Sequence, residues 1–184
     1  MSKLVIVESP AKAKTIQKYL GDDYSVLPTI GHIRELPKKD AIDPSDGYSM
    51  KYIVSPGKED AVKKIKGAAK NVEQVILATD PDREGEAIAW HVADIISNAK
   101  FEQPDIKRAV FYEISEKAVK DAVSNPGEIA MDLVQSQETR RALDRHFGFT
   151  LSPLLWRLFP SNNHSAGRVQ SPALRMIVER EREI

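Results

Sequence analysis

Short apolar runs alternate with helix-like segments over the first two-thirds of the chain. The runs are rich in Val, Ile and Leu and are bounded by polar or turn-forming residues, which is typical of buried strands. Strands are expected at residues 3–8, 24–30, 74–79 and 107–112. Helices are expected at residues 10–20, 56–70, 83–97 and 116–124. This alternation predicts a parallel, doubly wound α/β layer whose functional residues lie at the carboxyl ends of the strands.

Capping residues mark the ends of the expected helices. Ser9 and Ser55 each precede a proline, and Ser115 precedes the last helix of this part, so these serines are expected N-caps. Gly21 is expected to end the first helix. Residues 31–50 are rich in Gly, Pro and Asp and predict a long loop.

The pattern changes at the Asn-Pro-Gly sequence of residues 125–127. Only helical spacing follows, which predicts helices at residues 128–147, 152–159 and 168–184, with a polar loop at 160–167. Two domains are therefore expected, at residues 1–125 and 126–184. The last helix reaches Ile184 without a capping residue, so the chain is expected to be a fragment of a longer protein.

Composition restricts the class of protein. The 184 residues are 41% hydrophobic and 29% charged, which is typical of a soluble globular protein. No apolar run approaches the roughly 18 residues that cross a membrane, and no signal-peptide pattern is present, so no membrane contact is expected. The sequence has no cysteine, which excludes disulfides and thiolate metal sites and fits a cytoplasmic location.

The type of basic residue changes along the chain. Lys supplies 16 of the 19 basic residues in the first 120 positions, whereas all eight from residue 121 onward are Arg. Guanidinium groups suit bidentate phosphate contacts better than ammonium groups do. These Arg could equally pair with Asp and Glu of the same segment, as surface charges usually do. Composition alone leaves both interpretations open.

The densest candidate chemistry follows the expected strand at residues 74–79. Asp80, Asp82 and Glu84 alternate directly after it, and Glu8 ends the expected strand at residues 3–8. Clustered carboxylates repel one another unless a cation or a shared proton relieves the repulsion. Mg²⁺ takes few protein carboxylates and keeps several waters. The sequence therefore predicts a Mg²⁺ site built from Asp80 and Asp82 with Glu84 or Glu8.

The same acidic run is open to two other interpretations. It matches the first half of a calcium-binding EF-hand loop, but the twelfth position is His91 where a bidentate Glu is required. The acids could also simply begin a helix, with Asp80 as its N-cap and Pro81 in its first position. If Glu8 lies beside the cluster, a raised pKa would suit it as a general acid that protonates a leaving oxygen.

Several stretches resemble the bacterial type IA DNA topoisomerases. Residues 5–15, 31–37 and 78–91 resemble their TOPRIM domain, and residues 137–145, 152–156 and 165–171 resemble the start of their DNA-gripping helical domain. The Glu-Ser-Pro-Ala-Lys-Ala-Lys sequence from Glu8 to Lys14 favours the topoisomerase I branch over topoisomerase III or reverse gyrase. The resemblance implies a TOPRIM Rossmann-like parallel sheet flanked by helices, followed by the opening helices of an all-helical DNA-binding domain.

The resemblance also implies an activity and partners. Such enzymes relax negatively supercoiled DNA without ATP by cutting one strand through a 5′-phosphotyrosine link and resealing it, with Mg²⁺ as cofactor. The implied partner is a single-stranded DNA segment near a duplex. The implied parent protein is a cytoplasmic, nucleoid-associated monomer.

Site residues follow from the matched positions. The implied catalytic residues are Glu8 as the acid near the scissile phosphate, Lys12 against that phosphate and Arg168 near the scissile region. The implied metal ligands are Glu8, Asp80, Asp82 and Glu84. The implied DNA-binding residues are His32, Arg140, Arg141, Asp144, Phe149, Trp156, Ser165, Ala166, Gly167, Arg168, Val169 and Gln170. A helical surface pair for Arg140 and Asp144, and core packing for Trp156, are the structural alternatives.

This chain departs from the family in three places. Phe149 stands where the family often has Tyr, and His164 stands where it often has Leu. None of the five tyrosines lies in the family's nucleophile motif, so the fragment is not expected to form the covalent link. Two rival functions stay open: a TOPRIM-type metal-dependent nuclease, and a single-stranded DNA-binding module without chemistry.

Overall fold

The computed structural model describes residues 3–39, 41–43, 45–159 and 164–184. It forms two compact units, one ending at Gln137 and the other beginning at Glu138. The expected domain boundary near residue 125 stays a prediction. Parts of two predicted loops, residues 40 and 44 of the first and residues 160–163 of the second, lie outside the described residues.

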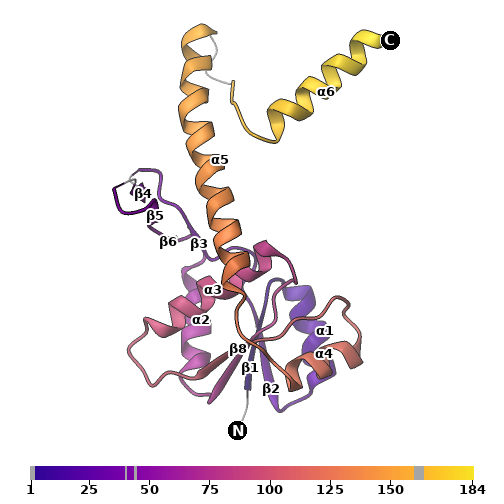
Figure 1. The fold of residues 1–184 in the computed structure, drawn as a ribbon. Coiled ribbons are helices and arrows are strands. Elements are labelled where there is room, and N and C mark those ends of the chain that lie inside the picture. The colour runs from indigo at the N-terminus through magenta and orange to yellow at the C-terminus, as the bar shows by residue number, and fades with distance from the viewer. Residues whose placement is uncertain (1–2, 40, 44, 160–163) are drawn as a thin grey trace. The chain divides into compact units, whose positions relative to one another are not determined.

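The first unit is built on a parallel sheet, as predicted. Among the described residues, the sheet has four strands in the order β2-β1-β7-β8. The strands are β1 (Lys3–Val7), β2 (Tyr24–Pro28), β7 (Gln74–Leu77) and β8 (Asp105–Arg108). The helices are α1 (Pro10–Leu20), α2 (Glu59–Ala69), α3 (Arg83–Ser97) and α4 (Glu116–Ser124). Figure 1 shows α1 and α4 on one side of the sheet and α2 and α3 on the other.

Successive residues of the central strand face opposite layers. Leu4 and Ile6 pack with residues of α2 and α3, whereas Val5 and Val7 pack with residues of α1 and α4. All four side chains are fully buried. Because helices cover both faces, the four strand positions after Lys3 are all apolar and buried, and this explains the continuous apolar runs of the sequence.

The connections reverse direction between β1 and β7. From β1 the chain passes through α1 to β2, and from β7 it passes through α3 to β8 on the other side of the sheet. Open α/β sheets bind ligands in the crevice that forms at such a point, beyond the carboxyl ends of the strands. Glu8 follows β1 and Asp80 follows β7, so the topology directs both toward this crevice.

Two of the three predicted serine caps are confirmed. The Ser9 hydroxyl accepts a hydrogen bond from the Lys12 amide at 3.3 Å at the start of α1. The Ser115 hydroxyl accepts one from the Ala118 amide at 3.3 Å at the start of α4. Gly21 ends α1 with a φ of 73°, as expected.

The predicted loop at residues 31–50 carries short antiparallel pairings. The pairs are β3 (Arg34–Glu35) with β6 (Ile53–Val54), and β4 (Ile42–Asp43) with β5 (Ser49–Met50). This excursion separates β2 from α2.

The third predicted cap, Ser55, is wrong. Helix α2 begins only at Glu59, and the Ser55 carbonyl oxygen accepts a hydrogen bond from the Lys58 amide at 3.0 Å in a turn. The Ser55 amide donates to the Ile33 carbonyl oxygen at 3.0 Å and so continues the contact between β3 and β6. Pairing with a distant segment therefore outweighs the local helix-start signal.

The last predicted strand is displaced. It was expected at residues 107–112 but forms at Asp105–Arg108. Val110 and Tyr112 are 43% and 88% exposed, because the apolar run continues past the sheet as a loop. Apolar content alone therefore placed the strand too late.

The second unit consists of the larger part of α5 (Met131–Leu158) and of α6 (Gln170–Glu183). The predicted break between residues 147 and 152 is wrong, because α5 continues through Pro153. Pro153 has no amide hydrogen to donate to the Phe149 carbonyl oxygen. Phe149 is 62% exposed, so water can take the place of that donor. None of the helices in the described part is long and apolar enough to cross a membrane.

Candidate active site

Glu8 and Asp80 meet at the crevice between β1 and β7. The Asp80 amide donates a hydrogen bond to Glu8 Oε1 at 2.9 Å. The carbonyl oxygen of Glu8 accepts a hydrogen bond from the Gly31 amide at 2.9 Å. The parallel topology thus brings together two acids that are 72 residues apart in sequence.

Lys12 completes this group from the first turn of α1. Its Nζ contacts Asp80 Oδ1 and lies 3.9 Å from Glu8 Oε2. The side chains of Lys12 and Asp80 are 23% and 43% exposed, so the group is open to a ligand on one side. An ammonium group beside two carboxylates neutralises part of their charge when no other cation is bound.

The surroundings shift the pKa values of Glu8 and Asp80 in opposite directions. Burial raises the pKa of Glu8, and the nearby Asp80 charge adds to this effect. Burial acts in the same direction on Asp80, but the hydrogen bonds from Lys12 and Glu8 and the Lys12 charge outweigh it and lower the pKa of Asp80. Two neighbouring carboxyls with opposite shifts can serve as a proton donor and an anion respectively.

Replacing Lys12 with methionine is expected to raise the pKa of Asp80, because the ammonium group stabilises the ionised carboxylate. The lowered pKa of Asp80 stabilises the fold at pH values above the pKa that Asp80 has in the unfolded chain. This stability is lost as the pH falls through the pKa that Asp80 has in the folded chain. The variant should therefore lose less stability than the native chain on acidification. NMR titration of the Asp80 carboxyl carbon measures the shift. Lys14→Met, at an exposed position of the same helix, is the control; an unchanged Asp80 titration in Lys12→Met would contradict the prediction.

Asp82 caps helix α3. Its Oδ1 accepts a hydrogen bond from the Gly85 amide at 2.7 Å, and the helix begins at Arg83. The alternative in which Asp80 is the N-cap is therefore wrong. The dipole of α3 places partial positive charge beside Asp82, which also favours a bound anion such as phosphate.

Glu84 belongs to a second polar group. Its Oε2 accepts a hydrogen bond from Gln137 Nε2 at 3.1 Å and lies 3.7 Å from His32 Nε2. A left-handed turn at Ile30 and Gly31, with φ of 60° and 81°, directs the chain to His32. Glycine adopts this conformation without strain, but Ile30 does not, so the fold holds the turn by other contacts. One such contact is the hydrogen bond from Lys58 Nζ to the Ile30 carbonyl oxygen at 2.6 Å.

The predicted metal ligands do not form one closed cluster. Among the described residues, no group of three or more His, Cys, Asp or Glu side chains is arranged to hold a metal ion. Their chemistry nevertheless fits Mg²⁺, because Asp80 and Glu84 are both 43% exposed and offer hard oxygen donors. Mg²⁺ is commonly held by one or two carboxylates, waters and substrate phosphate. The four-residue metal site stays a prediction.

A buried ion pair contacts residues 80–86 (the acidic loop), which include the first turn of α3; the sequence did not predict this pair. Arg108 is 1% exposed, and its Nε donates to Glu86 Oε2 at 2.9 Å. Its other nitrogens donate to the carbonyl oxygens of Leu77, Asp80 and Ala109 at 3.0, 2.9 and 2.5 Å. Glu86 Oε1 accepts a hydrogen bond from the Ala130 amide at 2.7 Å, so the pair joins the acidic loop to the segment that leads into α5. Nothing in the sequence marked Arg108, because an Arg at a strand end usually faces water.

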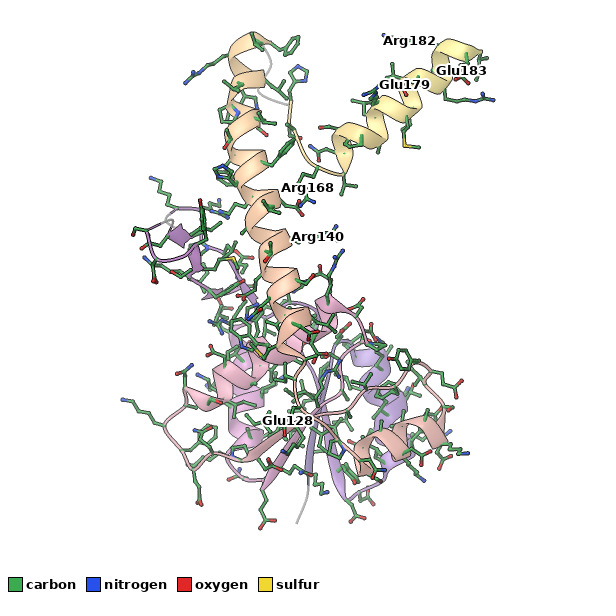
Figure 2. The ribbon with its side chains drawn as sticks, in the orientation of Figure 1. Glu128, Arg140, Arg168, Glu179, Arg182 and Glu183 are labelled. Carbon is green, nitrogen blue, oxygen red and sulfur yellow. The ribbon has the colours of Figure 1, made fainter. Side chains whose placement is uncertain are left out.

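In the second unit, Asp144 lies between two predicted DNA-binding arginines. Its Oδ1 accepts a hydrogen bond from Arg168 at 3.0 Å, and its Oδ2 lies 3.5 Å from Arg140 Nε. Figure 2 labels Arg140 on α5 and Arg168 on the segment that precedes α6. The surface pair that was the alternative for Arg140 and Asp144 is thus present. It does not prevent either arginine from contacting phosphate, because both are more than one-third exposed.

The remaining predicted DNA-binding residues lie along the same helix and segment. Phe149 is 62% exposed with the Arg145 guanidinium 4.5 Å from its ring centroid, and Trp156 is 45% exposed, so neither is a buried core residue of this chain. The Trp156 indole donates to the His164 carbonyl oxygen at 2.6 Å. Arg141 is partly buried and Val169 is exposed. The Gln170 side chain donates a hydrogen bond to Ser165 Oγ at 2.8 Å. The backbone amides of Ala166 and Gly167 donate to Ser152 Oγ at 3.1 Å and to Ser171 Oγ at 3.2 Å, respectively.

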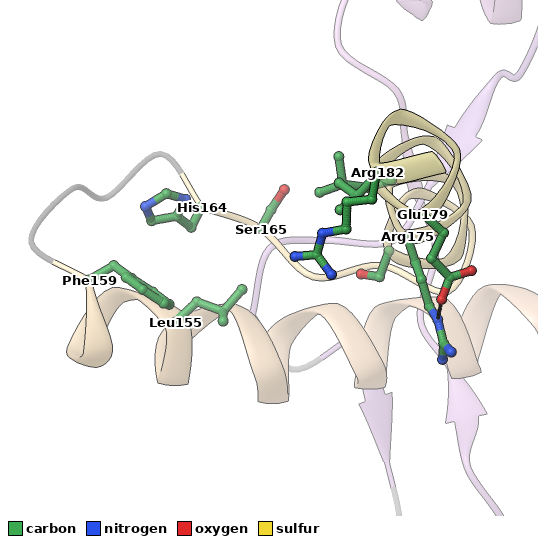
Figure 3. A pocket seen from close by; sticks show the side chains of 10 residues that line it. Leu155, Phe159, His164, Ser165, Arg175, Glu179 and Arg182 are labelled. Carbon is green, nitrogen blue, oxygen red and sulfur yellow. Dashed lines mark hydrogen bonds and ion pairs between the residues drawn. The ribbon is translucent and has the colours of Figure 1, made fainter. Parts of the chain in front are cut away.

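A pocket of about 600 Å³ lies in the second unit between the end of α5 and α6. Figure 3 shows Leu155 and Phe159 on one wall and the ion pair between Arg175 and Glu179 on the other. Among the predicted site residues only Ser165 lines it. The pocket therefore adds nothing to the acidic site of the first unit.

Comparison with known proteins gives two family matches in chain order. Residues 3–114 match the Toprim domain, and residues 128–184 match the family described as DNA topoisomerase. The chain is 54% identical over 183 residues to DNA topoisomerase 1 of Xylella fastidiosa strain Temecula1, covering 98% of this chain and 22% of that protein. It is 55% identical over 185 residues to DNA topoisomerase 1 of Rickettsia bellii, covering 99% of this chain and 23% of that protein.

A solved structure matches both the sequence and the fold. Full-length topoisomerase I from Thermotoga maritima is 47% identical with a TM-score of 0.85, over 98% of this chain and 30% of that chain. The chain thus spans less than a third of the length of the relatives it matches.

Proposed function

We propose that this chain, which belongs to the Toprim family and whose residues 128–184 match the family described as DNA topoisomerase, supplies part of a DNA-cleaving site. The proposed activity of the full-length protein is that of a type IA topoisomerase, which relaxes negatively supercoiled DNA by cutting and resealing one strand. The observation that carries the proposal is the group of Glu8, Asp80 and Lys12 at the crevice between β1 and β7. We place the boundary between the two domains near residue 125.

Glu8 and Lys12 have distinct proposed roles in strand cleavage. A tyrosine hydroxyl releases its proton to solvent and its oxygen attacks the scissile phosphorus, the bond from phosphorus to the 3′ oxygen breaks, and a 5′-phosphotyrosine link forms. Glu8 gives its proton to the leaving 3′ oxygen and recovers a proton when the strand is resealed, which its raised pKa favours. Lys12 contacts the phosphate as a point charge. The tyrosine is proposed to come from another part of the full-length protein.

Toprim domains bind a divalent metal ion, and we propose that the ion here is Mg²⁺. Asp80, Asp82 and Glu84 are its proposed protein ligands, with Glu8 nearby. When bound, Mg²⁺ would stabilise the charge that develops on the phosphate. Asp82 retains one carboxylate oxygen for this role while the other caps α3.

The proposed DNA contact surface combines arginines with exposed aromatic rings. Arg140, Arg141 and Arg168 would hold backbone phosphates, and Phe149 and Trp156 would stack on unpaired bases. Asp144 and residues 165–170 complete the proposed surface of the second unit, and His32 is a separate proposed DNA contact in the first unit. A single-stranded segment near a duplex is the proposed substrate, and the cytoplasm is the proposed location.

Glu8→Gln is expected to reduce cleavage of a labelled single-stranded oligonucleotide by the full-length protein about 10²–10⁴-fold, because the amide cannot donate the catalytic proton. The measurement is the amount of covalent protein–DNA complex formed per unit time. DNA affinity should stay close to that of the native protein, since the change removes no positive charge that binds phosphate. Glu73→Gln, at a distant exposed carboxylate, serves as the control.

The same assay separates the rival functions. Metal-dependent nicking that leaves no protein attached to the DNA would favour a nuclease. Unchanged affinity and unchanged activity in Glu8→Gln would favour a binding module without chemistry. Relaxation of supercoiled plasmid by the 184-residue chain alone would overturn the proposal that the tyrosine lies elsewhere.

A further inference from the structure

Gln137 is a buried polar residue beside the acidic loop. It lies on α5 and is 5% exposed. Its Nε2 donates a hydrogen bond to Glu84 Oε2 at 3.1 Å. Its Oε1 is buried and has no hydrogen-bond partner among the described residues.

The orientation of this amide follows from its neighbour. The amide nitrogen is the donor of this group and the Glu84 oxygen is the acceptor, so the nitrogen faces Glu84. The oxygen is on the same amide carbon and therefore lies next to the Glu84 contact. An acceptor that is buried without a donor costs free energy, and such atoms in folded proteins usually bind a water or an ion.

We propose that Gln137 is a positioning residue of the divalent-cation site. Its amide nitrogen fixes the Glu84 carboxylate, and its amide oxygen accepts a hydrogen bond from a water of the hydrated cation that Glu84 binds. Mg²⁺ keeps several waters when proteins bind it, so acceptors for those waters are part of such a site. Mutation of groups that hold metal ligands in place typically lowers metal affinity about 10–100-fold. This inference rests on the proposed function, because it requires a cation at Glu84.

The other neighbours of Glu84 leave room for this role. His32 Nε2 lies 3.7 Å from the same oxygen, Oε2, that Gln137 holds. The Glu84 side chain is 43% exposed, so it remains accessible to a hydrated ion. Gln137 thus orients one carboxylate oxygen while the other can bind the ion.

The test is a Mg²⁺ titration of the full chain in which NMR spectra record the amide chemical shifts of Asp80 and of residues 82–86. Gln137→Met keeps the side-chain volume similar but removes both polar atoms, and it is expected to weaken Mg²⁺ binding about 10–100-fold. Gln135→Met is the matched control, since Gln135 is exposed on the same helix. This variant should bind Mg²⁺ with the affinity of the native chain. Thermal unfolding of each variant shows that the fold is kept.

A double variant makes the assignment specific. In a Glu84→Gln background, Gln137→Met should cause no further loss of affinity, because the carboxylate that Gln137 positions is gone. Native-like Mg²⁺ affinity in Gln137→Met would overturn this inference and leave the proposed function intact. A native chain that binds no Mg²⁺ would overturn both. If Gln137→Met does not fold, Gln137→Leu is measured in its place against the same outcomes.

Discussion

Arg108→Met is expected to lower the free energy of unfolding by about 3–5 kcal/mol, the usual cost of removing one partner of a buried ion pair. The variant leaves Glu86 buried without its cation and leaves the carbonyl oxygens of Leu77 and Asp80 without their donor. Because Asp80 also contacts Glu8, the acidic site should be disturbed together with the fold. Urea unfolding measures the loss of stability.

Lys107→Met is the matched control for this prediction. Lys107 precedes Arg108 and pairs with Glu128 at 2.5 Å, but Glu128 is 75% exposed, so little change in stability is expected. The double variant of Arg108→Met and Glu86→Gln should lose less than the sum of the single losses, because the two residues interact. Equal losses of unfolding free energy in the Lys107 and Arg108 variants would show that the buried ion pair stabilises the fold no more than the exposed pair does.

Gly85→Ala is expected to destabilise the fold by about 3 kcal/mol, at the upper end of the cost of overpacking. An added Cβ would lie 2.2 Å from the Asp80 carbonyl oxygen and 2.8 Å from the Asp80 amide nitrogen. These are backbone atoms that cannot rotate away. Relief of the contact would shift Asp80 and weaken the cap in which the Gly85 amide binds Asp82. Strand cleavage by the full-length protein should fall along with stability.

Gly67→Ala supplies a control of opposite sign. Gly67 lies in α2, and an added Cβ there meets no atom within 4 Å. Alanine should therefore stabilise the helix by about 0.5–1 kcal/mol. A loss of stability in Gly85→Ala no greater than the effect of Gly67→Ala would contradict the close approach at Asp80. Urea unfolding under identical conditions compares the two variants.

The sheet and the positions of the two acids at its edge could be predicted from the sequence. Continuous apolar runs predicted β1 and β7, and parallel topology then requires that Glu8 and Asp80 share one edge. Local capping chemistry also identified Ser9 and Ser115, because a cap depends only on the three residues that follow it. Features that depend on neighbouring residues in the chain were therefore predictable.

Features that depend on distant partners were not predictable. Ser55 carries the same local signal as Ser9, but its pairing with Ile33 determines its conformation. Arg108 becomes a buried residue only because Glu86, from α3, provides a matching charge. Gln137 reaches Glu84 across 53 positions. Pro153 lies inside a helix that local rules would end. Each of these outcomes is a property of the folded chain rather than of a sequence window.

The carboxylate of Asp144 affects how steeply DNA affinity would depend on salt concentration. It already holds Arg168 and lies beside Arg140, so both guanidinium groups are partly neutralised before any phosphate arrives. An incoming phosphate would exchange with a side chain rather than add to a bare cation. Fewer salt ions would then be displaced per arginine than on a surface of unpaired arginines, and DNA affinity would fall less steeply as salt is added.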